Sequence, residues 1–443
     1  MSRTPSFVYL VLIGYVLVFG AYPVQADDAI GQWGRVVPIA DDAHPNLYYN
    51  QSEINELRVM VLVNRTPAYL YDLYLNSIRD ITAVVAQPGA HYTNSKAAVS
   101  YMLEPTSAKA YAIKASLISY MSSFPEGLGS WYDQAYGFSG LSLAWMFDLL
   151  QAYNPEMLSS TERTYVKAWF AKSAERLKFD TRKPYVNNDG TIAAPKTREG
   201  KTMNEFPNWF SRYMGPSLAC ALVSGSQAAV DYWADSGWPH TLFTTPWDIG
   251  SMGLSSAVNR YDLVMYLLST YASGANSDTY QREGFDLWNR TWYTTSYDAS
   301  PAHPLDNGSY HFAQQIGAMV AAEMAYHNGM TDVFTITDAD AEPALLRTYK
   351  RAIRSKTEVD LRPTSLTGHP NIGYYPMIWM GYRRYSDPLL DGAVSSLDMS
   401  LIGPEFPNEV YVFFGYPRRV VWPLPCGHHD ETIICISPLA RTP

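Results

Sequence analysis

The sequence has few charged residues, few cysteines and no excess of basic side chains. Charged types make up 17% of its 443 residues and apolar types 47%, a balance that excludes a disordered chain. The net charge of -9 opposes nucleic-acid binding, and a polyanionic ligand would need a local group of cations. Three cysteines, Cys220, Cys426 and Cys435, cannot form a disulfide framework, so we expect a large core to stabilise the fold.

Long apolar runs are also lacking after the first residues of the chain. Residues 1–26 carry one basic residue, an apolar run and small residues before a cleavage point at Ala26, which predicts a secretory signal peptide. No later stretch approaches the roughly 18 apolar residues of a membrane span, so we expect a secreted protein without membrane contact after cleavage. Glycosylation sequons fit this route, and they begin at Asn50, Asn64, Asn289 and Asn307.

Helical periodicity dominates from about residue 52 to residue 355. A capping box, Ser159-Ser160-Thr161-Glu162, predicts the start of one helix, and Asn328-Gly329 predicts the end of another. No period of 20 to 50 residues recurs, which disfavours a short-motif solenoid and leaves an all-α bundle or toroid. The clearest helices are predicted over Thr106–Met121, Gly140–Tyr153, Trp209–Val223, Tyr261–Tyr271, Tyr310–His327 and Pro343–Ser355.

The residue pattern of the sequence changes near its end. Val410–Phe414 and Val420–Trp422 are β-type runs separated by prolines. We therefore expect one helical domain over residues 27–400 and a short strand-containing or irregular tail over residues 401–443. A further segment rich in Pro, Asn and Gly, Lys183–Lys201, predicts a long loop of the kind that often covers an active site.

Two polar clusters stand immediately before apolar helical runs. The first is Asn204–Arg212, and the second is His303–Phe312. The N-terminus of a helix offers free amides and partial positive charge, which suit an anionic group of a substrate. These two clusters are the candidate site.

Both clusters resemble the alginate lyase family of polysaccharide lyases. In that family an Asn-His pair opens one inner helix of an incomplete α/α toroid, and a Tyr-His step opens another. Alignment without gaps puts Asn208 on the family's Asn and Trp209 on its His. In the second cluster, Tyr310 matches the catalytic Tyr, His311 the adjoining His, and His303 the position of a family Arg.

The resemblance has two departures, since Trp209 replaces a His and His303 replaces an Arg. Arg212, one helical turn after Asn208, is a candidate replacement cation. The opening His44–Tyr49 also looks like the leader of uronate-lyase toroids, and the resemblance spans roughly Asp42–Asp391. The resemblance implies an incomplete α/α toroid as the fold and a lyase activity on a 1,4-linked polyuronate, such as alginate, polymannuronate or glucuronan.

β-Elimination explains why such residues are required. The C5 proton of a uronate is poorly acidic until an amide and a cation neutralise the neighbouring carboxylate, the roles implied for Asn208 and for His311, His303 or Arg212. Tyr310 would take the proton and protonate the O4 leaving group, without a metal or other cofactor. Three of these residues also have a structural alternative. Asn208 fits a helix cap, His311 fits a core histidine, and Arg212 fits an ordinary ion pair.

Other polar and aromatic residues are candidates for binding the sugar chain. Aromatic side chains can stack on sugar rings, although helix packing explains them equally well. The candidate substrate-binding residues are Trp131, Tyr132, Tyr136, Trp209, His369 and Tyr374.

Two further readings stay open. A glycoside hydrolase on the same toroid would need paired carboxylates, and Glu205, Asp306 and Glu323 are the nearest candidates. A non-catalytic carbohydrate-binding protein would keep the cleft without the chemistry. Cys426-Gly427-His428-His429-Asp430-Glu431 lacks the second cluster that a zinc site needs, so we expect no metal there.

Overall fold

The structure is a computed structural model, and its described part is helical apart from two strand pairs. This confirms the all-α prediction for the described residues. The described residues are 36–85, 91–128, 134–177, 185–186, 192–193, 197–198, 201–202, 207–234, 320–331, 333–335, 343, 345–346, 376–395 and 408–421.

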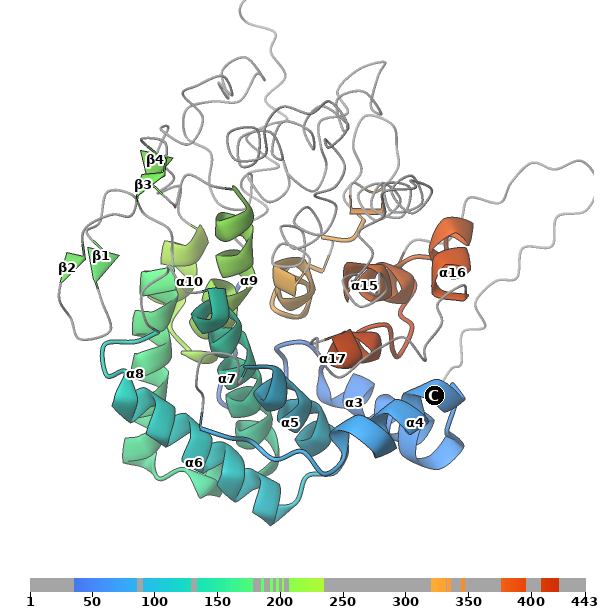
Figure 1. Cartoon of the computed structure of the whole chain (residues 1–443), viewed down its shortest axis with the longest axis horizontal. Helices are drawn as coiled ribbons and strands as arrows, with labels where there is room; N and C mark the ends of the chain where they lie inside the picture. Colours follow the sequence, from blue (N-terminus) through green and yellow to red (C-terminus); the bar gives the residue numbers. More distant parts are fainter. Residues whose placement is uncertain are drawn as a thin grey trace, which may run out of the picture.

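Six helices between residues 91 and 234 form two rows, with inner and outer helices alternating along the sequence (Figure 1). In the inner row α7 packs between α5 and α9, and in the outer row α8 packs between α6 and α10. Every residue from 139 to 150 of α7 is buried, whereas α6 and α8 alternate buried and exposed positions. A helix that is apolar on all sides belongs in the interior, and an amphipathic helix covers it. The bounds are α5 His91–Leu103, α6 Ser107–Ser123, α7 Gln134–Tyr153, α8 Ser160–Leu177, α9 Pro207–Val223 and α10 Gln227–Ala234.

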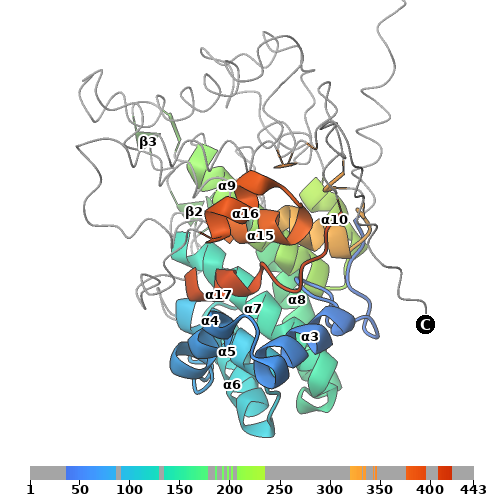
Figure 2. The same ribbon diagram turned by 90° about the vertical axis from the view of Figure 1, so that its right-hand side faces the viewer.

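Helices from the two ends of the described chain lie together beside this double row (Figures 1 and 2). From the N-terminal side, α3 packs against α5, while α17 from the C-terminal side packs against α4, α5 and α15. A further inner helix, residues 320–327, lies between α9 and α15 in Figure 1. The bounds are α3 Gln51–Arg58, η1 Val59–Asn64, α4 Ala68–Leu73, η2 Tyr74–Ile78, η3 Pro155–Met157, α15 Pro376–Arg384, α16 Pro388–Ser395 and α17 Asn408–Phe413.

Local sequence signals fix several helix ends. The capping box predicted at Ser159 is confirmed: the Ser159 N–H donates to Glu162 Oε2 at 2.8 Å, and the Glu162 N–H donates to Ser159 Oγ at 3.2 Å. The predicted end at Asn328-Gly329 is also confirmed, because Gly329 has a φ of 114° that favours glycine. Thr106 caps α6 as its position in the sequence suggests.

The strand predicted at Val410–Phe414 is wrong, because Asn408–Phe413 forms the helix α17. Val410, Val412 and Phe413 are buried in the common core, and the Phe414 ring lies 5.0 Å from the ring of Tyr48. Tertiary packing therefore overrides the β-propensity of this run. Val420 and Val421 lie in no strand either.

The predicted loop Lys183–Lys201 contains short paired strands. β1 (Tyr185–Val186) pairs antiparallel with β2 (Ile192–Ala193), and β3 (Thr197–Arg198) pairs with β4 (Lys201–Thr202). These two-residue pairs stand just before α9 in the sequence. The predicted long loop thus contains two short antiparallel pairs.

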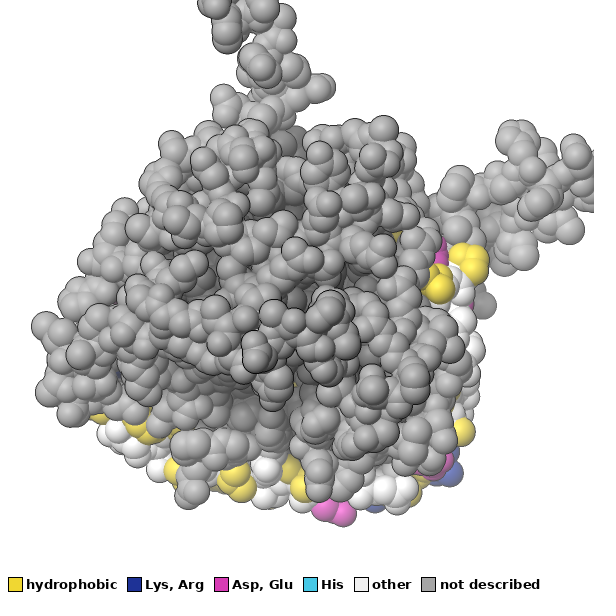
Figure 3. Space-filling model, turned by 45° about the horizontal axis from the view of Figure 1, so that its top comes forward, with side chains coloured by type: hydrophobic (Ala, Val, Ile, Leu, Met, Phe, Trp, Pro, Cys, Tyr) yellow, Lys and Arg dark blue, Asp and Glu magenta, His cyan; other side chains and the backbone are white. Residues whose placement is uncertain are grey.

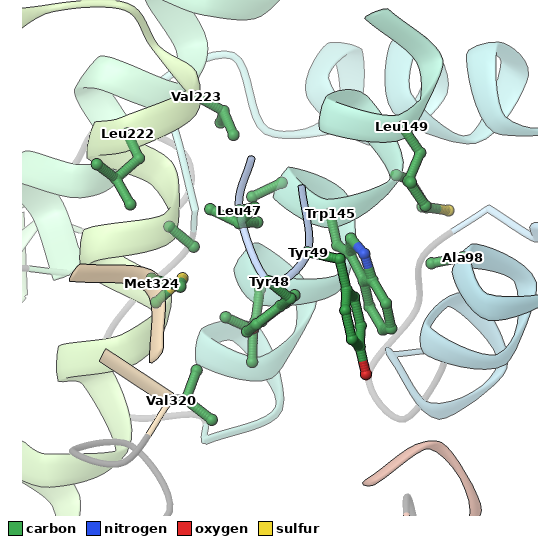
Figure 4. Packing of buried hydrophobic residues seen from close by; sticks show 14 of the residues in the cluster. Leu47, Tyr48, Tyr49, Ala98, Trp145, Leu149, Leu222, Val223, Val320 and Met324 are labelled. Atoms are coloured by element: carbon green, nitrogen blue, oxygen red, sulfur yellow. The ribbon is translucent and has the colours of Figure 1, made fainter. Parts of the chain in front are cut away.

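The segment Leu47–Tyr49 runs through the middle of the core (Figure 4). It lies among side chains of α5, α7, α9 and the 320–327 helix, including Trp145 of α7 and Met324. Cys220 of α9 is a buried free thiol, and burial raises its pKa. Among the described helices none is long and apolar enough to cross a membrane.

Candidate functional site

The first turns of α9 carry one of the two predicted polar clusters. The helix begins at Pro207, a residue favoured at a first helical position because proline has no N–H to leave unpaired. Asn208 and Arg212 lie four residues apart in α9, so their Cα–Cβ bonds share one face of the helix. Both residues therefore lie in the first turns of α9, about one helical turn apart.

Residues 36–39 tie α9 to the 320–327 helix. The Ile39 N–H donates to Leu222 O at the end of α9, at 3.0 Å, and the Val37 N–H donates to Asn328 O, at 2.9 Å. The C-terminal ends of the two helices are thus neighbours, since alternate residues of an extended chain are about 7 Å apart. Asn208, in the first turn of α9, lies about 21 Å from Leu222 at 1.5 Å per residue.

Asp148 of α7 anchors the leader segment at the same junction. Its Oδ1 lies 2.6 Å from His44 Nδ1, and its Oδ2 accepts the Leu47 N–H at 3.0 Å. The side chain of Asn46 donates to His327 O at 2.8 Å, which connects the leader to the 320–327 helix. These contacts give the His44–Tyr49 motif a structural role near the C-terminal ends of α7 and the 320–327 helix.

Beside this junction lies a buried group of five ionisable side chains, which we call the ion cluster: Glu53, Glu323, His327, Arg383 and Arg384. Arg383 donates to Glu53 Oε1, and Arg384 forks onto Glu323, with Nη2 on Oε1 and Nε 3.1 Å from Oε2. The side chains of all five are at most 4% exposed. Because isolated charges are very costly to bury, this degree of pairing is a condition for the cluster to exist.

His327 completes the ion cluster. Its Nε2 lies 2.8 Å from Glu53 Oε2, and its Nδ1 lies 3.0 Å from the backbone oxygen of Glu323. Both neighbours are acceptors, so the protonated ring satisfies both contacts, whereas a neutral ring satisfies only one.

The two carboxyl groups of the ion cluster are held ionised. Burial by itself raises the pKa of Glu53, but the hydrogen bond with His327 and the charge of Arg383 outweigh it and keep that pKa below its ordinary range. Burial likewise opposes ionisation of Glu323, and the charges of Arg384 and Arg383 outweigh it, so its pKa is also lowered. The Glu323 side chain is 1% exposed and Arg384 holds both of its oxygens, so it does not face a sugar chain, which removes it from the carboxylates proposed for a hydrolase.

Aromatic rings cover the two guanidinium groups. Arg383 Cζ lies 4.7 Å from the centre of the Tyr49 ring, and Arg384 Cζ lies 4.0 Å from Tyr326 and 5.0 Å from Phe334. Such contacts stabilise a desolvated cation. Sequence reasoning missed the ion cluster, although two adjacent arginines among the apolar residues of Pro376–Arg384 were a signal in a chain with few charges.

The described residues include only part of the predicted site. Asn208, Trp209 and Arg212 lie in the first turns of α9 and Tyr136 in the first turn of α7, all with side chains outside the described part. Among the described residues no group of three or more His, Cys, Asp or Glu side chains could hold a metal ion. The predicted residues that lie outside the described residues are Trp131, Tyr132, Glu205, His303, Asp306, Tyr310, His311, His369, Tyr374 and the 426–431 motif.

No family model, curated protein or solved structure matches this chain. The described side chains visible in Figure 3 form the lower and right-hand rim, where isolated acidic and basic groups lie among hydrophobic and uncharged ones. This rim shows no concentration of cations. In the sequence, Arg212 of α9 is the candidate cation closest to Asn208.

The lowered pKa of Glu53 makes a stability prediction with a definite sign. A carboxyl group whose pKa is lower in the folded state stabilises the fold above its unfolded pKa, about 4.3, and loses that contribution as the pH falls toward the folded value. We expect the difference in unfolding free energy between wild type and Glu53→Gln to be largest at neutral pH and to shrink below about pH 4. Urea unfolding at several pH values measures it. A difference that stays constant from pH 7 to pH 3 would contradict the role of the ionised Glu53.

Proposed function

We propose that the chain is a secreted polysaccharide lyase that cleaves a 1,4-linked polyuronate by β-elimination. The observation that carries this proposal is the placement of Asn208 and Arg212 on one face at the start of the inner helix α9. The alternating inner and outer rows of helices also support an incomplete α/α toroid. In that architecture the ends of the inner helices lie around one cleft.

In the proposed reaction Asn208 and Arg212 neutralise the carboxylate of the uronate at the cleavage point. Charge develops on that carboxylate as the C5 proton leaves, so an amide and a cation on one helix face stabilise the transition state. Tyr310 takes the C5 proton and returns a proton to the O4 leaving group, with His311 and His303 as the cations that favour its phenolate. The C4–O4 bond breaks and a C4–C5 double bond forms, with no metal.

The net negative charge of the chain opposes the binding of a polyuronate. At a net charge of -9 the overall field repels a polyuronate, so binding must depend on a few cations in the cleft and must weaken with salt. Sugar rings would stack on Trp131, Tyr132, Tyr136, Trp209 and Tyr374, with His369 beside them.

Incubation of the purified protein with alginate, polymannuronate and glucuronan tests the proposal. A lyase produces new ultraviolet absorbance from unsaturated uronyl ends together with new reducing ends. Reducing ends without that absorbance would indicate a hydrolase, and retention of the polymer without cleavage would indicate a binding protein. Either of these two results would overturn the proposed elimination.

A further inference from the structure

Two of the glycosylation sequons lie in the described part of the chain, and their surroundings differ. One begins at Asn50, directly before α3, and the other begins at Asn64, the last residue of η1. An N-linked oligosaccharide is bulky and polar, so a folded protein retains it at an asparagine on the surface. Burial and hydrogen bonding therefore distinguish the two sequons, although their sequence patterns do not.

The sequon at Asn64 is exposed over all three of its residues, Asn64, Arg65 and Thr66. Arg65 has a φ of 53°, in the left-handed region, so the chain turns sharply at the middle of the sequon. Within the described part of the chain, no hydrogen bond involves the Asn64 side chain. This side chain can therefore carry a large substituent without the loss of a native contact.

Other groups hold the turn at Asn64 in place. The Thr66 N–H donates to Met60 O at 3.0 Å, and the Thr66 hydroxyl donates to Asn64 O at 3.1 Å. The guanidinium carbon of Arg65 lies 4.5 Å from the centre of the Tyr71 ring of α4. The turn is thus fixed without the Asn64 side chain.

Asn50, in contrast, is half-buried and caps α3. Its Oδ1 accepts the Glu53 N–H at 3.0 Å, and its own N–H donates to Glu53 Oε2 at 3.1 Å. Tyr49, directly before the cap, and Glu53, which belongs to the ion cluster, are buried. A large substituent would crowd a side chain that the cap holds beside these residues, so we expect none on Asn50.

The helices that flank Asn64 lie away from the predicted polar cluster of α9. α3 and α4 are separated from α9 in both views of the ribbon (Figures 1 and 2). An oligosaccharide at Asn64 is therefore not expected to cover the start of α9.

We propose that Asn64 carries an N-linked oligosaccharide, and that Asn50 stays unmodified, when the chain passes through a eukaryotic secretory compartment. The donor is an oligosaccharide linked through a diphosphate to a polyprenol. Asn64 Nδ2 forms a bond to C1 of the first sugar, the bond between C1 and the diphosphate oxygen breaks, and the amide nitrogen loses one proton. The inference rests on the secretion that the proposed function includes, and not on the elimination reaction.

Three variants of the full chain, expressed in eukaryotic cells, test the inference: Asn64→Gln, Thr66→Ala and the control Ser52→Ala. The first two remove the sequon at Asn64, one through the acceptor and one through the hydroxyl that the pattern requires. Ser52→Ala removes the sequon at Asn50 in the second way and leaves the Asn50 cap in place. Each variant changes one exposed side chain, so all three should fold and be secreted.

Glycan occupancy is measured separately on the peptides that contain Asn50 and Asn64, by mass spectrometry before and after an N-glycosidase. In secreted wild type we expect a glycan on Asn64 in more than about half of the molecules, and on Asn50 in fewer than about a tenth. Thr66→Ala should leave Asn64 unmodified, and Asn64→Gln should lack the same glycan. Ser52→Ala should keep the wild-type occupancy at Asn64.

Secreted wild type with a lower occupancy at Asn64, or a higher one at Asn50, would overturn the inference and leave the proposed lyase intact. A wild-type chain that the cells do not secrete would remove the secretion included in the proposed function, and the glycan with it. A secreted chain that carries the glycan but releases no unsaturated uronyl ends would remove the elimination reaction and leave the glycan at Asn64 in place.

Discussion

Tyr310→Phe is expected to lower the rate of β-elimination by at least about 100-fold while the fold stays intact. The substitution removes one hydroxyl group and keeps the ring, so packing changes little. In the proposed reaction that hydroxyl takes the C5 proton and protonates O4, and general acid–base catalysis commonly contributes 10²- to 10⁴-fold. Loss of both transfers from one residue places this among the largest effects expected for any substitution in the chain.

Initial rates of ultraviolet absorbance on the preferred polyuronate measure this effect. Tyr111→Phe is a matched control, because Tyr111 lies on α6 with 65% of its surface exposed and should leave the rate unchanged. Retention of more than about a tenth of the wild-type rate, a loss under roughly 1.4 kcal/mol, would remove Tyr310 from the mechanism.

The helices that the sequence predicted best are those with both periodicity and a cap. The runs beginning at Thr106 and Ser160 have an N-cap hydroxyl followed by amphipathic spacing, and both helices begin within one residue of the predicted start. Such signals are local, because the cap and the first turn are only three residues apart. For the candidate site, the helix predicted over Trp209–Val223 is confirmed as α9, which begins two residues earlier and so includes Asn208 as well as Arg212.

Features that depend on distant partners could not be predicted in this way. Val410–Phe413 has a β-type composition, and it is helical because its apolar side chains pack against α4, α5 and α15. The ion cluster could not be predicted for the same reason, since Arg383 and Glu53 are 330 residues apart in the sequence. Periodicity indicates that a side chain is buried, but it does not indicate which residue lies opposite.

The buried pair of Arg383 and Glu53 gives a second large expected effect. Arg383→Met should destabilise the protein by about 3–5 kcal/mol. Removing one member of a buried ion pair leaves the other charged and desolvated, which costs far more than the pair contributes. Here Glu53 would keep the His327 contact and the Asn50 N–H, 3.1 Å from its Oε2, but lose the guanidinium on Oε1. Tyr49 would also lose the cation over its ring.

Denaturant unfolding of wild type, Arg383→Met and Arg79→Met measures the difference. Arg79 pairs with Glu104 at 3.2 Å, but the two side chains are 49% and 34% exposed, so its loss should cost at most about 1 kcal/mol. Arg383 contacts two buried carboxylates, those of Glu53 and Glu323, whereas Arg79 contacts one exposed carboxylate, so the contrast compares a buried arginine with an exposed one. Equal losses in the two variants would mean that Glu53 regains solvent or changes its protonation when Arg383 is absent, and that α3 and α15 are not held together by this charge.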